Sequence, residues 1–200
     1  MLTTIGFILF GYFTGSLLFA RYFSNLFCGK DVTVDTPDSN PGTYNAYTYG
    51  GFWCGALTLV CDLLKGFLPV FLYIRVSGGT PLGLVLVMSA PALGHIFPIW
   101  HKFDGGKGIA VSFGVLLAPN MLPVLTLALT YLLFSLVFKV NPHFYRLILT
   151  YSTAFGIILL TSRSFSVTLG CAAVFVIVLL KIISVRDTYD KMTVRAAWKR

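Results

Sequence analysis

The sequence predicts an all-α, polytopic membrane protein with seven transmembrane helices, one of them short. Of its 200 residues, 56% are hydrophobic, and the charged residues are only 15 Lys plus Arg and seven Asp. That is too few for the polar surface of a soluble domain. The apolar residues gather in stretches of about 20, the length at which a helix crosses the hydrocarbon core of a bilayer. We therefore expect one integral membrane domain over residues 1–200.

The basic residues predict how the chain lies in the membrane. Their excess gives a net charge of +8, and Lys and Arg are concentrated on the cytoplasmic side of membrane proteins. They fall at the ends of apolar segments and form no patch of the kind that binds nucleic acid. The cysteines lack the spacing of a metal site and are interpreted as small side chains in or near the membrane: Cys28, Cys54, Cys61 and Cys171.

The first span is expected from Leu2 to Phe23, with its N-terminus outside. Gly11, Gly15 and Ser16 give it a strip of small residues on which a neighbouring helix can pack closely. Residues 24–51 are polar and rich in turn formers, which predicts a long cytoplasmic loop. Long ordered loops usually carry function.

The second and third spans are expected from Phe52 to Val76 and from Leu82 to Trp100. The second contains Asp62 and Lys65, which are three residues apart on one helical face and can neutralise each other. Charged groups in a membrane segment face the protein interior. This pair is expected either to hold helices together or to line a polar pocket.

The stretch after the third span can be divided in two ways. If the piece from Ile109 to Ala118 crosses as a short helix, there are seven spans, and only Arg75 and Arg163 among the loop cations lie outside. A six-span arrangement with one broken helix gives a much weaker charge bias, so the positive-inside rule favours seven. The short helix would need a thinned bilayer or burial against its neighbours. The remaining spans are Met121 to Phe138, Leu147 to Leu160 and Phe165 to Ile183.

The C-terminal tail, residues 184–200, is predicted to be an amphipathic helix on the cytoplasmic face. Its apolar residues recur at helical spacing, with charges on the other side. The C-terminus is therefore expected to be cytoplasmic, on the same side as the loop of residues 24–51.

A glycine-rich loop follows the third span and contains a candidate phosphate site. Gly105, Gly106 and Gly108 allow several backbone N–H groups to converge on one point, and Lys107 adds a positive charge. An anion such as phosphate is the natural ligand of that combination. The alternative is a tight turn between two helices.

Other polar residues on the same predicted face are further candidates. His95, near the end of the third span, is either an interfacial residue or a proton-transfer group close to Lys107. The segment SNPGTYN could form a turn in which Asn40, Gly42 and Asn45 bind an anion or a hydroxyl, although these are also ordinary turn residues. No serine lies in a nucleophile-elbow pattern and no residues have triad spacing, so a covalent mechanism is not indicated.

Four segments, GSLLFA, SNPGTYNA, CDLLKG and GHIFPIWHKFDGGKGIAVS, resemble the bacterial membrane glycerol-3-phosphate acyltransferases that use acyl-phosphate as donor. The match covers about residues 11–140 in order and spacing. It implies a multi-pass enzyme of phospholipid biosynthesis in the bacterial plasma membrane, with acyl-phosphate and glycerol-3-phosphate as substrates, lysophosphatidic acid as product, and no metal or other cofactor. With the resemblance, the expected catalytic residues are His95, Lys107 and Ser39. The expected substrate- and phosphate-binding residues are Asn40, Gly42, Asn45, Gly105, Gly106, Lys107 and Gly108.

The chain departs from that family's pattern at several positions. Asp38 lies where the family has a serine, unless Ser39 substitutes by a shift of one residue. Tyr44 lies at a threonine position and Thr48 at an arginine position, where a bidentate phosphate contact is lost. The family's C-terminal glutamate motif is absent, since the chain contains no Glu. A protein that binds a phosphate metabolite without turnover is therefore the alternative, and an anion transporter is a third hypothesis resting only on Asp62 and Lys65.

Overall fold

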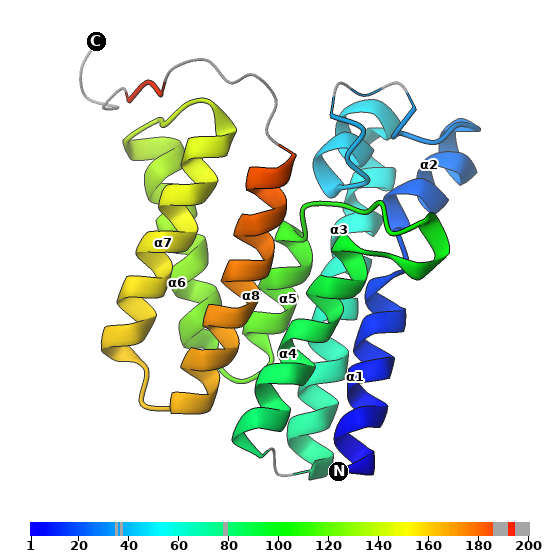
Figure 1. Ribbon diagram of the computed structural model, residues 1–200. Coiled ribbons are helices and arrows are strands. Elements are labelled where there is room, and N and C mark those ends of the chain that lie inside the picture. The colour runs from blue at the N-terminus through cyan, green and yellow to red at the C-terminus, as the bar shows by residue number, and fades with distance from the viewer. Residues whose placement is uncertain (35, 37, 78–79, 186–191, 195–200) are drawn as a thin grey trace.

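The computed structural model describes residues 1–34, 36, 38–77, 80–185 and 192–194. The described residues form helices that run side by side between two ends of the molecule (Figure 1). The helices and their bounds are α1 Leu2–Gly15, α2 Phe19–Cys28, α3 Thr43–Ser77, α4 Pro81–Ile96, α5 Ile109–Leu117, α6 Met121–Leu132, α7 His143–Thr161 and α8 Phe165–Ser184. A 3-10 turn at Ile99–His101 extends α4, and a π turn at Leu133–Val137 extends α6.

Among the described residues, five segments are long and apolar enough to cross a membrane: Leu2–Cys28, Thr43–Ser77, Pro81–His101, His143–Thr161 and Phe165–Ser184. Met121–Val137 is a shorter apolar segment, and α5 has only nine residues. The prediction of an all-helical membrane protein is confirmed. The number of crossings and the orientation remain predictions.

The first predicted span and the loop after it differ from the structure in their bounds. The chain leaves the helical path after Gly15 and resumes it at Phe19, so the span from Leu2 to Phe23 is two helices. The loop expected over residues 24–51 is shorter, because α2 extends to Cys28 and α3 begins at Thr43.

Local sequence explains where α2 ends and where the path of α3 is broken. In α2, Phe19 and Phe23 are one turn apart and their rings stack with centroids 6.0 Å apart. The helix ends at Gly29, whose φ of 67° gives the left-handed C-cap that glycine adopts without strain. In α3, Gly51 has φ 84° and breaks the helical path between the first two turns and the membrane segment.

The short helix α5 is stabilised by close packing against α3. A Cβ on Gly114 would overlap the backbone of Leu63, and one on Gly66 would overlap the backbone of Val111. Glycine at both contacts therefore allows the two helix backbones to touch. The burial that the sequence analysis required of a short helix is present, since α5 has five buried residues: Val111, Ser112, Gly114, Val115 and Leu116.

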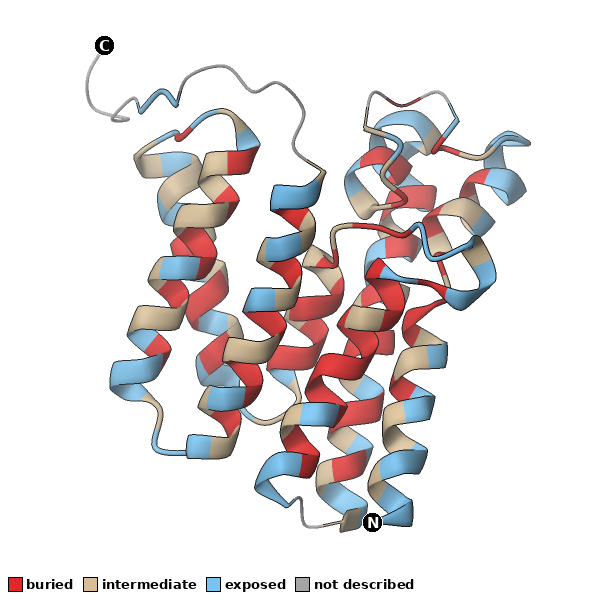
Figure 2. Cartoon of the chain, viewed as in Figure 1, coloured by how far each residue is buried: buried red, intermediate tan, exposed pale blue. Residues whose placement is uncertain are grey.

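Buried residues concentrate between the helices and exposed apolar residues on their outer faces (Figure 2). Leu129, Leu159 and Leu180, for example, are about 60% exposed, as expected of side chains that face lipid. Most of the predicted tail helix, residues 184–200, lies outside the described residues. Within the described part, Thr193 exchanges two backbone hydrogen bonds with Asn141, at 2.9 and 3.0 Å.

Candidate functional site

Two loops that are distant in sequence meet at the end of the molecule away from the N-terminus (Figure 1). One joins α2 to α3 and the other joins α4 to α5. The backbone N–H of Lys107 donates a hydrogen bond to Oδ1 of Asn40 (3.1 Å), and the Lys107 ammonium lies 2.8 Å from Oδ2 of Asp38. The predicted anion loop and the SNPGTYN segment are therefore in direct contact.

The first loop is folded around the Asp38 carboxylate. Its Oδ1 accepts hydrogen bonds from Nδ2 of Asn45 (2.8 Å) and from the backbone N–H of Asn40 (3.3 Å). Nδ2 of Asn45 also donates to the backbone oxygen of Asn40 at 2.9 Å. Asn45 is buried in the first turn of α3, so this helix end holds the loop in place.

Two opposing effects act on the pKa of Asp38. Partial burial disfavours the carboxylate and raises the pKa, whereas the hydrogen bonds from Lys107 and Asn45, with the charge of Lys107, lower it. The second group of effects prevails, and the pKa lies below its ordinary value. The Asp38 side chain is therefore a carboxylate at neutral pH.

The second loop lies directly on His95. The backbone N–H of Gly106 donates to the backbone oxygen of His95 (3.1 Å), and a Cβ on Gly106 would overlap Nε2 of the imidazole. A Cβ on Gly105 would overlap the His95 backbone oxygen. Gly108, with φ 79°, then caps the start of α5. The loop therefore requires glycine at these positions. Lys107 lies next to the N-terminus of α5, and a helix N-terminus favours a bound anion.

His95 is 3% exposed, and its imidazole ring contacts the side chain of Lys65. The Lys65 ammonium lies 2.9 Å from Nδ1 of His95. Because an ammonium group can only donate hydrogen bonds, Nδ1 must accept, and the proton of the neutral ring is on Nε2. His95 therefore turns an N–H donor towards Gly106.

Lys65 also contacts Asp62 and the break between α1 and α2. Its ammonium lies 2.7 Å from Oδ1 of Asp62, in a pair whose side chains are 3% and 2% exposed, and it donates to the backbone oxygen of Leu17. That carbonyl is free for a side-chain partner because the helix is interrupted there. The expectation that Asp62 and Lys65 face the interior and neutralise each other is confirmed, and the pair joins α3 to neighbouring elements.

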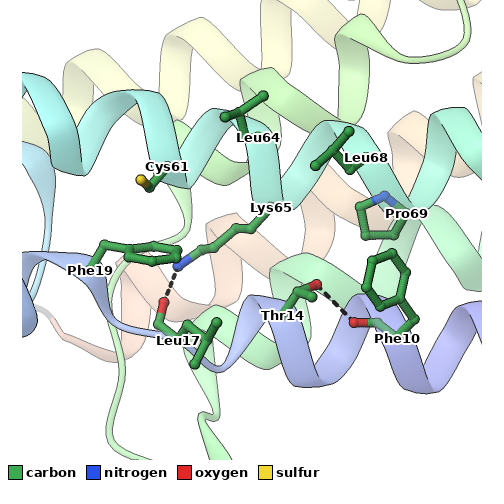
Figure 3. Close-up of a pocket in the computed structure, with 9 residues that line it drawn as sticks. All are labelled: Phe10, Thr14, Leu17, Phe19, Cys61, Leu64, Lys65, Leu68 and Pro69. Atoms are coloured by element: carbon green, nitrogen blue, oxygen red, sulfur yellow. Dashed lines mark hydrogen bonds between the residues drawn. The ribbon is translucent and has the colours of Figure 1, made fainter.

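An apolar groove lies between α3 and the segment formed by α1 and the start of α2, and Lys65 is one of its lining residues (Figure 3). Its volume is about 220 Å³. Its lining consists mostly of apolar side chains and comprises Phe10, Thr14, Leu17, Phe19, Cys61, Leu64, Lys65, Leu68 and Pro69. Lys65 therefore fits the interpretation as a link between helices, because its ammonium is held by Asp62, the Leu17 backbone oxygen and His95, and the groove surface beside it is apolar.

The remaining candidates are placed as follows. Gly42 lies in the turn before α3, where its N–H donates to the backbone oxygen of Asn40 at 2.8 Å. Ser39 is exposed with φ 46°, next to Asp38. Thr48, at the family's arginine position, is exposed on the first turns of α3. Within the described part of the chain, no three His, Cys, Asp or Glu side chains are grouped as metal ligands.

Sequence reasoning missed two contacts of this site. It noted Asp38 as a departure from the family's serine and did not pair it with Lys107, 69 positions later. It also considered Lys65 and His95 separately, although they touch. Each pair includes a charged residue for which a polar partner could have been sought elsewhere in the sequence, and this was the signal that could have found the contact.

The family model of the glycerol-3-phosphate acyltransferases matches residues 5–194. Among similar proteins, the glycerol-3-phosphate acyltransferase of Myxococcus xanthus is 37% identical over 138 residues, which are 69% of this chain and 71% of the relative. Glycerol-3-phosphate acyltransferase 2 of Thermotoga maritima is 37% identical over 133 residues, 66% of this chain and 67% of the relative.

The fold resembles the crystal structure of PlsY (YgiH), an integral membrane glycerol 3-phosphate acyltransferase. Its glycerol 3-phosphate form aligns with a TM-score of 0.78 over 90% of this chain and 88% of the other, at 23% identity. Its lysophosphatidic acid form aligns with a TM-score of 0.76 over 89% and 87%, also at 23% identity. At this identity the likeness concerns the fold.

Proposed function

The chain belongs to the family of glycerol-3-phosphate acyltransferases, and from that premise we propose that it transfers an acyl group from acyl-phosphate to glycerol-3-phosphate where the two loops meet. The product is lysophosphatidic acid, an early intermediate of phospholipid biosynthesis. The relatives bear the name of active acyltransferases, which gives no support to the alternative of binding without turnover.

The observation that carries this proposal is the convergence of donors around Lys107. The ammonium group, the glycine backbone and the start of α5 all favour a bound phosphate. His95 adds an N–H directed at Gly106, and Asn40 fixes the backbone of Lys107. Asn45 and Gly42 hold the first loop against the second.

The chemistry needs no covalent intermediate on the protein. The acceptor hydroxyl attacks the carbonyl carbon of acyl-phosphate, and the bond between that carbon and the phosphate oxygen breaks. The leaving phosphate keeps the electron pair and takes the hydroxyl proton. Lys107 and the N-terminus of α5 stabilise the charge on that phosphate, so that positioning and electrostatics supply the rate. Ser39, exposed beside Asp38, is assigned to hydrogen bonding with the acceptor.

The groove in Figure 3 suits the acyl chain of the donor. It is lined mainly by apolar side chains, and its lining includes Lys65, whose ammonium contacts His95 under the glycine loop. A chain lying in it would bring the acyl-phosphate head to the level of the loops. The hydrophobic effect would then contribute to donor binding.

The orientation follows from the positive-inside rule. Arg21, Lys107 and Lys181 lie towards the loop end of the molecule, whereas Arg75 and Arg163 lie towards the other end. This distribution supports a cytoplasmic site in a bacterial plasma membrane, with the N-terminus outside.

Acyl transfer to labelled glycerol-3-phosphate in membranes that contain the protein tests the proposal, with palmitoyl-phosphate as donor. Lys107→Ala is expected to reduce the rate by at least about 100-fold, as for other groups that stabilise transition-state charge. Lys102→Ala removes a neighbouring exposed lysine and should have little effect. Formation of lysophosphatidic acid no faster than in the Lys107→Ala membranes would reject the proposal.

A further inference from the structure

The Asp38 carboxylate lies on the Lys107 ammonium, the cation that the proposed function assigns to a phosphate. It lies 2.8 Å from the Lys107 ammonium and accepts hydrogen bonds from Nδ2 of Asn45 and from the backbone N–H of Asn40, at 2.8 and 3.3 Å. Carboxylate and phosphate oxygens are recognised by the same charged and N–H donors. One anionic group of the protein therefore already occupies the cradle.

This contact is accessible to an exchanging ligand. The side chain of Asp38 is 26% exposed and that of Lys107 is 16% exposed, so water and solutes reach the pair. An ion pair at a partly exposed position contributes at most about 1 kcal/mol. A phosphate group with two negative charges can displace a carboxylate held this weakly.

We propose that Asp38 is an intramolecular competitor for the phosphate cradle, which sets the affinity of the site for phosphate substrates. It pairs with Lys107 in the resting site and leaves when the phosphate of a substrate binds. The apparent dissociation constant for phosphate is then the intrinsic constant divided by the fraction of molecules in which Lys107 is free. This inference rests on the proposed function, because it takes the bound anion to be that of the substrate.

The geometry argues against two other roles for Asp38. As a general base it would need an oxygen directed at the acceptor, but both oxygens already accept hydrogen bonds from within the two loops. As a fixed structural ion pair it would be shielded from solvent, as Asp62 and Lys65 are. Asp38 is neither free nor shielded, which is the condition for exchange.

The test compares binding of inorganic phosphate and of glycerol-3-phosphate to the purified full-length protein by isothermal titration calorimetry. Asp38→Asn keeps the size of the side chain and removes its charge, and the dissociation constant is expected to fall about fivefold. Asp38→Ser should act in the same direction. Asp104→Asn is the matched control, because Asp104 is an exposed acid on the loop that carries Lys107, and it should change little.

A double substitution shows whether the effect passes through Lys107. In a Lys107→Met background, Asp38→Asn should give no tightening, since the competed cation is gone. Phosphate binding that is unchanged or weaker in both folded Asp38 variants would overturn the inference. Tighter binding by proteins that show no acyl transfer would support the inference and reject the proposed function, so the two failures can be told apart.

Discussion

Two aspartate–lysine pairs of nearly equal length have different surroundings in this protein. Asp62 and Lys65 lie 2.7 Å apart on one helix, with side chains 2% and 3% exposed. Asp38 and Lys107 lie 2.8 Å apart on two loops, with side chains 26% and 16% exposed. The first pair is permanent, because the packed helices shield both side chains from water and solutes. The second can be exchanged for a ligand.

The difference shows how one chemical contact can serve structure or function. Removing one partner of a buried pair is strongly destabilising, since it leaves a single charge in an apolar interior. When one partner of a partly exposed pair is removed, water and solutes replace it, so the cost is small. His95 lies between the two pairs: it contacts Lys65 on one side and the glycine loop that carries Lys107 on the other. The buried pair therefore gives the exchangeable phosphate site a rigid support.

Breaking the buried pair should produce the largest effect on stability. Lys65→Met leaves the Asp62 carboxylate uncompensated, and we expect the free energy of unfolding to fall by about 3–5 kcal/mol. Unfolding in detergent followed by circular dichroism measures this. A variant as stable as the wild type would contradict the account of a permanent pair.

The double variant Asp62→Leu with Lys65→Met is the matched control for that experiment. It replaces both charges by apolar side chains of similar volume and should recover most of the lost stability. Its acyl transfer should stay low, because Lys65 no longer fixes the ring of His95. Recovery of full activity together with stability would show that His95 needs no such support.

Filling the contact between the glycine loop and His95 should have an intermediate effect. Gly106→Ala places a Cβ against Nε2 of His95, and forced repacking of this kind costs about 1–3 kcal/mol. Acyl transfer should fall more than stability does, because the shift moves Lys107. Gly156→Ala is the control, since a Cβ there meets no atom within 4 Å, and equal loss of rate in both variants would exclude a role for this contact.

Removing one charge of a partly exposed pair outside the site should have the smallest effect. Arg21 and Asp31 lie 3.5 Å apart with side chains that are both 22% exposed. Asp31→Asn should lower the free energy of unfolding by less than about 1 kcal/mol and leave acyl transfer unchanged. A loss as large as that of Lys65→Met would mean that exposure is a poor guide to the weight of these pairs.

The sequence predicts the apolar helices well because hydropathy and breakers are local properties. The second, third, fourth and last two predicted spans agree with α3, α4, α5, α7 and α8 to within a few residues, apart from the first turns of α3. The break at residues 16–18 has no Pro, and its stability depends on Lys65, 48 positions away from Leu17. Such a boundary is set by tertiary contacts, which no local pattern contains.

The same distinction applies to the site. Gly105, Gly106, Lys107 and Gly108 are recognisable because an anion loop needs consecutive residues of a given kind. The partner of Lys107 is not, because it depends on how the α2 to α3 loop folds over the end of α4. The serine position of the family drew attention to Asp38, but only the structure shows the Lys107 ammonium beside it.

Binding of glycerol-3-phosphate to the purified protein tests the central claim, that Lys107 is the exchangeable cation of a phosphate cradle. The account predicts that Lys107→Met raises the dissociation constant at least tenfold, while Lys102→Met, at an exposed lysine five positions earlier, leaves it unchanged. Equal affinity in the wild type and in both variants would contradict the account.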